Sequence, residues 1–243
     1  QPATRGTSMM HLSLLTLPRT APRWRFLEPY QLHQLIWKGF PGIERIEGSR
    51  PFLYRHNEEA AEHSILVLSA VKPDWSGLED EAEGSTTQHR TIDPQGLPEG
   101  ARLRFFVRAN PVVERKGYAD NASRRIIVGG NLKRVADKMG VTVDALENRE
   151  ERLTAWIERK GGDGGFAIER DELGRPLLMI APNHDYRIRR SRDKSATPMT
   201  FTGVDFEGIL RITDPAAFAA TLQRGIGRGK AFGFGLLSVA KVG

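Results

Sequence analysis

The apolar positions of this chain follow strand-like and helix-like spacings in the same order twice. In the first half, alternating leucines from Leu12 to Leu17 predict a strand. Leu32, Leu35 and Ile36 form one stripe of a short helix over 30–38. The remaining elements expected in this half are strands over 51–56, 64–71 and 88–93 and a weak helix near the acidic residues 79–83. The order is strand, helix, strand, strand, helix, strand.

A second set of elements follows residues 94–100, where two prolines and two glycines predict a linker. Arginine alternates with apolar residues over 102–109, which is typical of a strand with one solvated, cationic face. A basic irregular segment follows this strand. Helices are expected over 142–160 and from the cap at Asp214 to Gly225. The strands expected after the first of these helices are 166–169, 177–180, 185–192, 198–212 and 234–242.

Two successive strand-helix-strand-strand-helix-strand units predict an α+β protein made of two tandem ferredoxin-like (RRM-like) domains with antiparallel sheets. We place the first domain at 10–97 and the second at 98–243. Residues 1–9 are interpreted as an extension or the remnant of a tag.

Composition excludes several classes of protein. The 243 residues contain no Cys, which rules out disulfide frameworks, thiol catalysis and Cys-based metal sites. No stretch approaches the roughly 20 consecutive apolar residues of a membrane helix, and residues 9–17 lack the features of a signal peptide. We therefore expect a soluble cytoplasmic protein without contact to a membrane.

The net charge of +6 is unevenly distributed. Between residues 101 and 135, nine Lys and Arg stand against two acids, and a second basic run covers 187–194. Either cluster alone is consistent with a solvated face. Two Arg-rich clusters together favour phosphate contacts, because the guanidinium fork matches phosphate oxygens.

A glycine-rich string, residues 225–235, joins the last helix to the last strand. It lacks the G-x-G-x-x-G pattern and leads into a strand, which excludes a dinucleotide-binding turn. Gly229-Lys230 is followed by Ala231, which excludes a Walker phosphate loop. The string indicates either a loop whose backbone approaches a phosphate or another chain, or tight packing of the last strand.

This string resembles the glycine-rich signature of the RAMP superfamily of CRISPR-associated proteins, with Gly225-Ile226-Gly227 and Gly233-Phe234-Gly235 at the family's spacing. The resemblance is specific to the CasE subfamily, the pre-crRNA endoribonucleases of type I-E Cascade. The segments that carry it, in the family's order, are 30–33 (Tyr-Gln-Leu-His), 104–111, 206–208 and 235–238. It runs from about residue 10 to the C-terminus, with its weakest coverage at 72–88 and 116–141.

The resemblance implies cleavage of CRISPR repeat RNA at the base of its stem-loop, with no metal and no cofactor. The products would be a 2′,3′-cyclic phosphate or 3′-phosphate and a 5′-hydroxyl, and the protein would keep the hairpin within Cascade, beside the other subunits. It assigns proton transfer to His33, a supporting role to Tyr30 and, more weakly, charge stabilisation to Lys38. An imidazole suits this role because both its forms are accessible near neutral pH.

The RNA contacts expected from the basic clusters and the glycine-rich string involve residues of three segments. They are Arg102, Arg104 and Arg108 on one strand, Arg187, Arg189, Arg190, Arg192 and Lys194 on a basic hairpin, and Gly225, Gly227, Arg228 and Lys230. Two alternatives remain open on the sequence alone. One is a RAMP subunit that holds RNA without cutting it, and the other is a generic basic RNA-binding protein.

Overall fold

The computed structural model describes residues 9–22, 24–44, 50–81, 84–116, 123–128, 132–140, 142, 148–181, 184–188 and 199–242. Its first half contains β1 (Met10–Pro18), α1 (Pro29–Lys38), β2 (Phe52–Glu58), β3 (Glu62–Ser69), α2 (Ser76–Glu81) and β4 (Thr86–Ile92). The strands form one sheet in the order β2-β3-β1-β4, and each neighbouring pair is antiparallel. This is the element order that the apolar pattern predicts.

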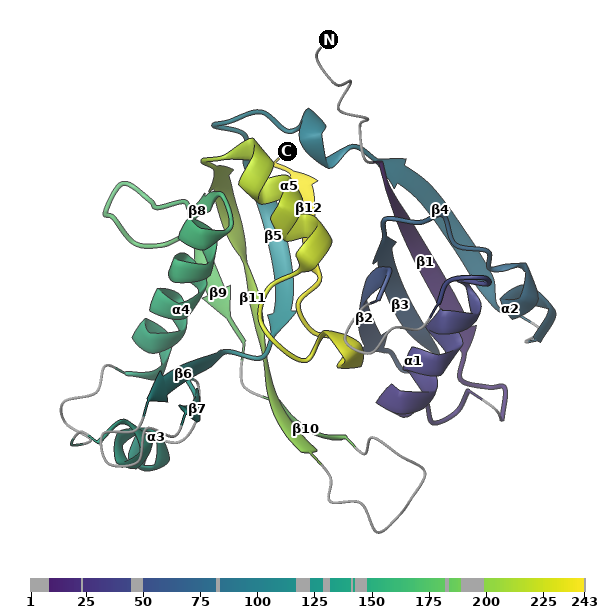
Figure 1. Ribbon diagram of the computed structural model, residues 1–243, viewed down its shortest axis with the longest axis horizontal. Helices are drawn as coiled ribbons and strands as arrows, with labels where there is room; N and C mark the ends of the chain where they lie inside the picture. Colours follow the sequence, from purple (N-terminus) through teal and green to yellow (C-terminus); the bar gives the residue numbers. More distant parts are fainter. Residues whose placement is uncertain are drawn as a thin grey trace.

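The second half forms a larger antiparallel sheet in the order β10-β11-β5-β12, with β8 and β9 also paired to β11. Its elements are η1 (Pro94–Gly96), β5 (Arg102–Ala109), β6 (Val112–Lys116), β7 (Ser123–Ile127), α3 (Leu132–Met139), α4 (Arg149–Asp163), β8 (Phe166–Ile168), β9 (Leu178–Ile180), β10 (His184–Ile188), β11 (Met199–Ile212), α5 (Pro215–Arg224), η3 (Lys230–Phe232) and β12 (Leu237–Lys241). The prediction of an α+β protein with two antiparallel sheets is confirmed. The two sheets stand side by side (Figure 1).

Two predictions for the second half need correction. The segment expected to be irregular contains the β6–β7 hairpin and the helix α3. The helix α4 begins at Arg149 rather than at 142, because Asn148 caps it: its side chain accepts the N–H of Glu151 at 2.9 Å, and Glu151 accepts the N–H of Asn148 at 3.1 Å. This reciprocal capping pattern is legible in the sequence as Asn-x-x-Glu.

The core lies in two clusters, one under the helices of each sheet. In the first, Leu15 and Leu17 of β1 meet Leu32 and Ile36 of α1. The intervening β1 residues point to the opposite face, because side chains alternate along a strand. That opposite face contributes Met10 to the second cluster, which also holds the aromatic residues between the larger sheet, α4 and α5. The two halves are therefore packed together through apolar contact.

A polar junction reinforces this contact and corrects one expectation. Arg108 forms a two-pronged ion pair with Asp205 at 2.7 and 2.9 Å, and its Nη1 donates to the carbonyl of His56 on β2 at 2.8 Å. Its side chain is only 19% exposed, whereas those of Arg102 and Arg104 are 54% and 66% exposed. Arg108 thus joins the halves of the molecule instead of sharing an open cationic face with the other two arginines.

Among the described residues, no helix combines the length and apolar character needed to span a bilayer.

His56 makes the stability of this junction depend on pH. Burial, then the neighbouring His63, and then Arg108 and Arg19 lower the pKa of His56 from 6.5 to about 4. The unfolded chain, where the imidazole has its ordinary pKa, therefore binds more protons between pH 6.5 and 4. The contribution of neutral His56 to the free energy of unfolding is fully present above pH 6.5 and is lost as the pH falls toward 4.

Between pH 7 and 4.5, the free energy of unfolding measured by urea denaturation should fall by on the order of 2 kcal/mol more for the wild type than for His56→Gln. Equal pH dependence for the wild type and His56→Gln would contradict a half-buried, neutral His56.

Candidate active site

The helix α1 positions the predicted catalytic residues. Pro29 occupies its first turn, and the N–H of Glu28 donates to the side chain of Gln31 at 3.2 Å. Leu32, Leu35 and Ile36 anchor its buried face. Tyr30 and His33 are both half-buried and stand three residues apart, so they occupy neighbouring positions on one face of the helix.

His33 lies in an aromatic pocket and has a defined partner. The Nε1–H of Trp37 donates to its Nε2 at 3.0 Å, and the rings of Phe52 and Tyr54 lie 5.7 and 6.5 Å from the imidazole. An indole nitrogen can only donate, so Nε2 must be the acceptor. The neutral imidazole therefore carries its proton on Nδ1.

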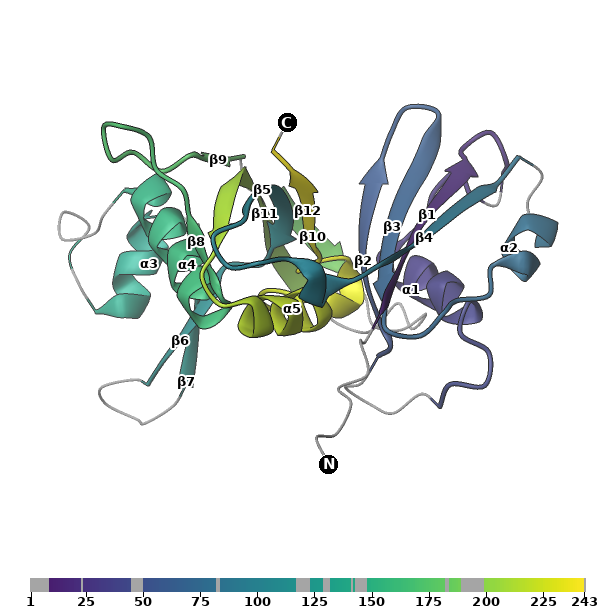
Figure 2. The same ribbon diagram turned by 90° about the horizontal axis from the view of Figure 1, so that it is seen from above.

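The glycine-rich string meets this helix. The short helix η3 contacts both α1 and β2 (Figures 1 and 2). The hydroxyl of Tyr54 on β2 donates to the carbonyl of Ala231 in η3 at 2.9 Å. Tyr54 is fully buried, and burial raises its pKa, so the phenol keeps the proton that it donates. The structure thus brings a segment near the C-terminus against the pocket that holds His33.

The ends of the glycine-rich string explain part of its composition. The N–H of Ile226 donates to the carbonyl of Gly235 at 2.8 Å, and the N–H of Gly235 donates to the carbonyl of Arg108 at 2.7 Å. Gly235 has φ +85°, and a Cβ there would lie 2.5 Å from the carbonyl oxygen of Ile226. A Cβ at Gly225 would likewise meet the carbonyl of Gly235. The ends of the string therefore fit tight backbone packing, which is one of the two interpretations that the sequence left open.

The central part of the string carries cations. Lys230 is half-buried, and burial, followed by Arg50, Arg224 and Lys160, lowers its pKa. Burial also lowers the pKa of Arg50, which precedes β2. Within the described part of the chain, neither Lys230 nor Arg50 forms an ion pair with a carboxylate. The positive charge beside α1 is therefore available to an anionic group.

The other predicted residues are placed less closely. Lys38 is exposed, and its fifth position after His33 puts it about 140° around the helix axis. Arg102 lies 3.8 Å from Glu169, and Arg104 lies 3.7 Å from Glu207. Arg187 belongs to β10. Four residues of the expected hairpin lie outside the described residues: Arg189, Arg190, Arg192 and Lys194.

Sequence reasoning missed Trp37, Tyr54 and Arg50. Trp37 stands four residues after His33, a spacing that brings side chains together on a helix and could have indicated the contact. Tyr54 and Arg50 reach the site through tertiary packing, for which no local pattern exists.

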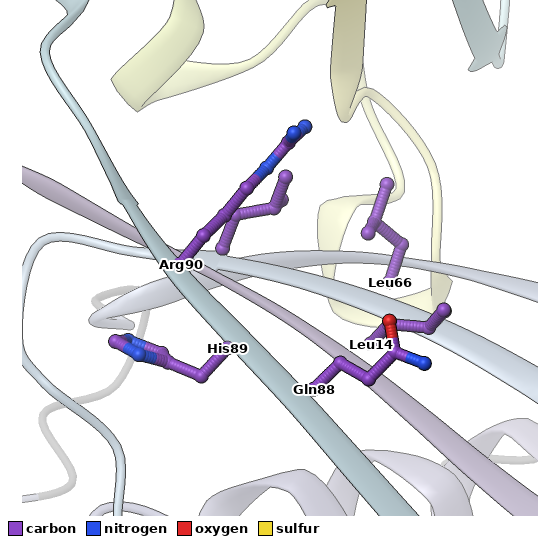
Figure 3. A pocket seen from close by; sticks show the side chains of 6 residues that line it. Leu14, Leu66, Gln88, His89 and Arg90 are labelled. Atoms are coloured by element: carbon purple, nitrogen blue, oxygen red, sulfur yellow. The ribbon is translucent and has the colours of Figure 1, made fainter.

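A hollow of about 240 Å³ lies elsewhere, on the sheet of the first half, where Leu12, Leu14, Leu66, Gln88 and Arg90 contribute to its lining (Figure 3). It holds none of the predicted site residues. In the part of the chain that the structure describes, no three His, Asp or Glu side chains gather as ligands of a metal ion would.

The contact between Trp37 and His33 is open to a direct test. Long-range ¹H–¹⁵N spectra of the RNA-free protein should show the Nδ1–H tautomer for His33. Trp37→Phe keeps an aromatic ring but removes the donor, so it should release His33 from this single tautomer. Trp75→Phe, another buried tryptophan of the same core, should leave the His33 signals unchanged. A wild-type His33 that carries its proton on Nε2 would contradict the assignment.

Comparison with known proteins identifies the family. A model described as "CRISPR associated protein" matches residues 10–241. The CRISPR-associated endoribonuclease Cse3 of Thermus thermophilus is 34% identical over 90% of this chain and 93% of its own length. The CRISPR system Cascade subunit CasE of Escherichia coli is 30% identical over 95% and 99%. A solved structure of Cse3 bound to a 19 nt RNA has a TM-score of 0.73 and 31% identity, and covers 96% of this chain and 99% of that one. The chain therefore belongs to the CRISPR-associated protein family that includes Cse3 and CasE.

Proposed function

We propose that this protein is the endoribonuclease that cleaves CRISPR repeat RNA at the base of the repeat stem-loop, and that it stays bound to the product hairpin as a subunit of Cascade. Its similarity to Cse3 and CasE over nearly the whole chain supports this function. The observation that carries the proposed site is the packing of the cationic glycine-rich string against the helix of His33.

The proposed reaction needs only groups of the RNA and the protein. The ribose 2′-oxygen attacks the adjacent phosphorus, a new O–P bond forms, and the bond from phosphorus to the 5′-oxygen breaks. The 2′-hydroxyl loses a proton and the leaving 5′-oxygen gains one, which leaves a 2′,3′-cyclic phosphate and a 5′-hydroxyl. His33 transfers a proton in this exchange, and general acid–base catalysis of this kind contributes about 10²–10⁴-fold.

Two features of the site shape this proposal. Nε2 of His33 accepts from Trp37 and Nδ1 is buried, so the imidazole must turn away from Trp37 to reach the RNA. Lys230 and Arg50 stand on the side where the glycine-rich string meets α1, and they would stabilise the charge that develops on the phosphate. Tyr30 would orient the phosphate, and Lys38 would add charge at the end of the helix.

We also propose two ferredoxin-like domains, with their boundary near residue 97. The strand order β4-β1-β3-β2 and the helix placement of the first half support this topology. Exposed Arg102 and Arg104, with the basic residues of the sequence run 187–194, would contact RNA phosphates. A CRISPR RNA substrate is consistent with a cytoplasmic location.

The catalytic assignment is tested by cleavage of a cognate repeat hairpin in excess EDTA, with the product ends mapped. Wild-type protein should cut once, leave a 5′-hydroxyl, and fail on RNA with a 2′-deoxyribose at the cut. His33→Ala should lower the single-turnover rate constant about 10²–10⁴-fold while binding the hairpin as tightly. His89→Ala should cut at the wild-type rate.

Each other outcome has a distinct meaning. Unchanged cleavage by His33→Ala would remove His33 from the reaction. Tight binding without any cleavage by the wild type would indicate the non-catalytic RNA-binding subunit. Equal affinity for unrelated hairpins at one fixed salt concentration would indicate a generic basic RNA-binding protein.

A further inference from the structure

A cationic depression lies where the glycine-rich string passes α4. It has a volume of about 410 Å³, and it is lined by Val112 and Val113 of β6, by Trp156, Arg159 and Lys160 of α4, and by Gly227 and Arg228. We call it the Gly227 pocket. Its lining brings together three cations from two segments far apart in the sequence, and among the described residues it includes no carboxylate.

The charge of this pocket is continuous with the charge beside α1. Burial lowers the pKa of Lys230 most, and the charges of Arg50, Arg224 and Lys160 lower it further. Lys160 of α4 therefore lies close to Lys230. Gly227 and Lys230 are three residues apart, so their Cα atoms are separated by at most about 11 Å. One side of the same loop therefore faces the His33 helix, and the other side faces α4.

The apolar floor of the pocket cannot hold a base by stacking. Trp156 is only 2% exposed, its ring stacks on Phe206 at a centroid distance of 5.7 Å, and its Nε1–H points to the carbonyl of Val112. Among the described lining residues, no aromatic face is therefore left for a nucleobase. The groups that reach the opening are charged side chains and a loop without a side chain at Gly227, which suit a phosphate better than a base.

We propose that the Gly227 pocket binds the sugar-phosphate backbone of the RNA, on the side of the glycine-rich string opposite His33. Arg159, Lys160 and Arg228 supply the charge, and the ligand is a phosphodiester recognised without regard to base. This inference rests on the proposed function. It adds an anion site on α4, whose opposite face packs into the core through Leu153 and Ile157.

The test measures binding of a repeat hairpin that cannot be cut because it carries a 2′-deoxyribose at the cleavage position. Arg159→Gln/Lys160→Gln should weaken binding about tenfold at 0.15 M salt. The slope of log K against log salt should become shallower by about one for each phosphate that the variant no longer binds. The weakening should be equal for a second hairpin of the same length whose base pairs are exchanged.

Lys241→Gln is the matched control, since it removes one exposed cation from β12, at the end of the strand away from the glycine-rich string (Figure 1). It should leave the affinity and the salt slope unchanged. Arg159 and Lys160 also lie near the C-terminus of α4, where cations stabilise a helix. Arg228→Gln, which changes the loop instead, should therefore reproduce the weaker binding independently of α4.

The results separate this proposal from the proposed function. Unchanged affinity in both pocket variants would overturn the pocket, even if the wild type cuts RNA. A weakening confined to the cognate hairpin would overturn backbone recognition in favour of base reading. Failure of the wild type to cut would contradict only the nuclease, because binding of the uncleavable hairpin does not depend on the reaction.

Discussion

The hydrogen bond from Tyr54 to the carbonyl of Ala231 is the contact on which the geometry of the site depends. It ties β2, in the sheet that supports the His33 helix, to a loop that begins about 170 residues later at Gly225. The donor is fully buried, and removal of its acceptor would leave a polar group unsatisfied inside the protein at a cost of about 1–3 kcal/mol. Because the loop is anchored in this way, Lys230 of η3 is held in place beside α1.

Charge of one sign then accumulates on both sides of that loop. Lys230 and Arg50 lie toward α1, and Arg159, Lys160 and Arg228 lie toward α4. Like charges disfavour one another, and after burial the neighbouring cations are the second cause that lowers the pKa of Lys230. An RNA backbone bound at the proposed site would relieve this repulsion and release its counterions. The like charges that repel one another in the RNA-free protein would then favour the complex.

Much of this fold is predictable because its signals are local. The stripe of α1, the alternation of β5 and the cap before Pro215 each need only a few neighbouring residues. The β6–β7 hairpin and α3 were missed because the basic charge of their segment masks its apolar spacing, although Leu132, Val135 and Met139 stand at helical positions and do indicate α3. For the site, the motif around His33 and Tyr30 is informative only through its family resemblance, since a lone histidine on a short helix has no distinctive spacing.

Contacts between distant segments explain the remaining differences. Alternation on β5 indicates that Arg102, Arg104 and Arg108 share a face, but not that the first half of the chain covers one end of that face. Likewise, nothing in the sequence around Tyr54 indicates that its hydroxyl donates to the carbonyl of Ala231.

The most direct test of this account is the single-turnover cleavage rate of Tyr54→Phe at saturating RNA. The variant keeps the ring and removes only the hydroxyl that holds Ala231. Loss of about 1.4 kcal/mol of positioning predicts a rate constant reduced about tenfold, with the fold intact. Tyr186→Phe, a hydroxyl removed from the other sheet, should cut at the wild-type rate. A Tyr54→Phe protein that is less stable but cuts as fast as the wild type would contradict the dependence of the site on this bond.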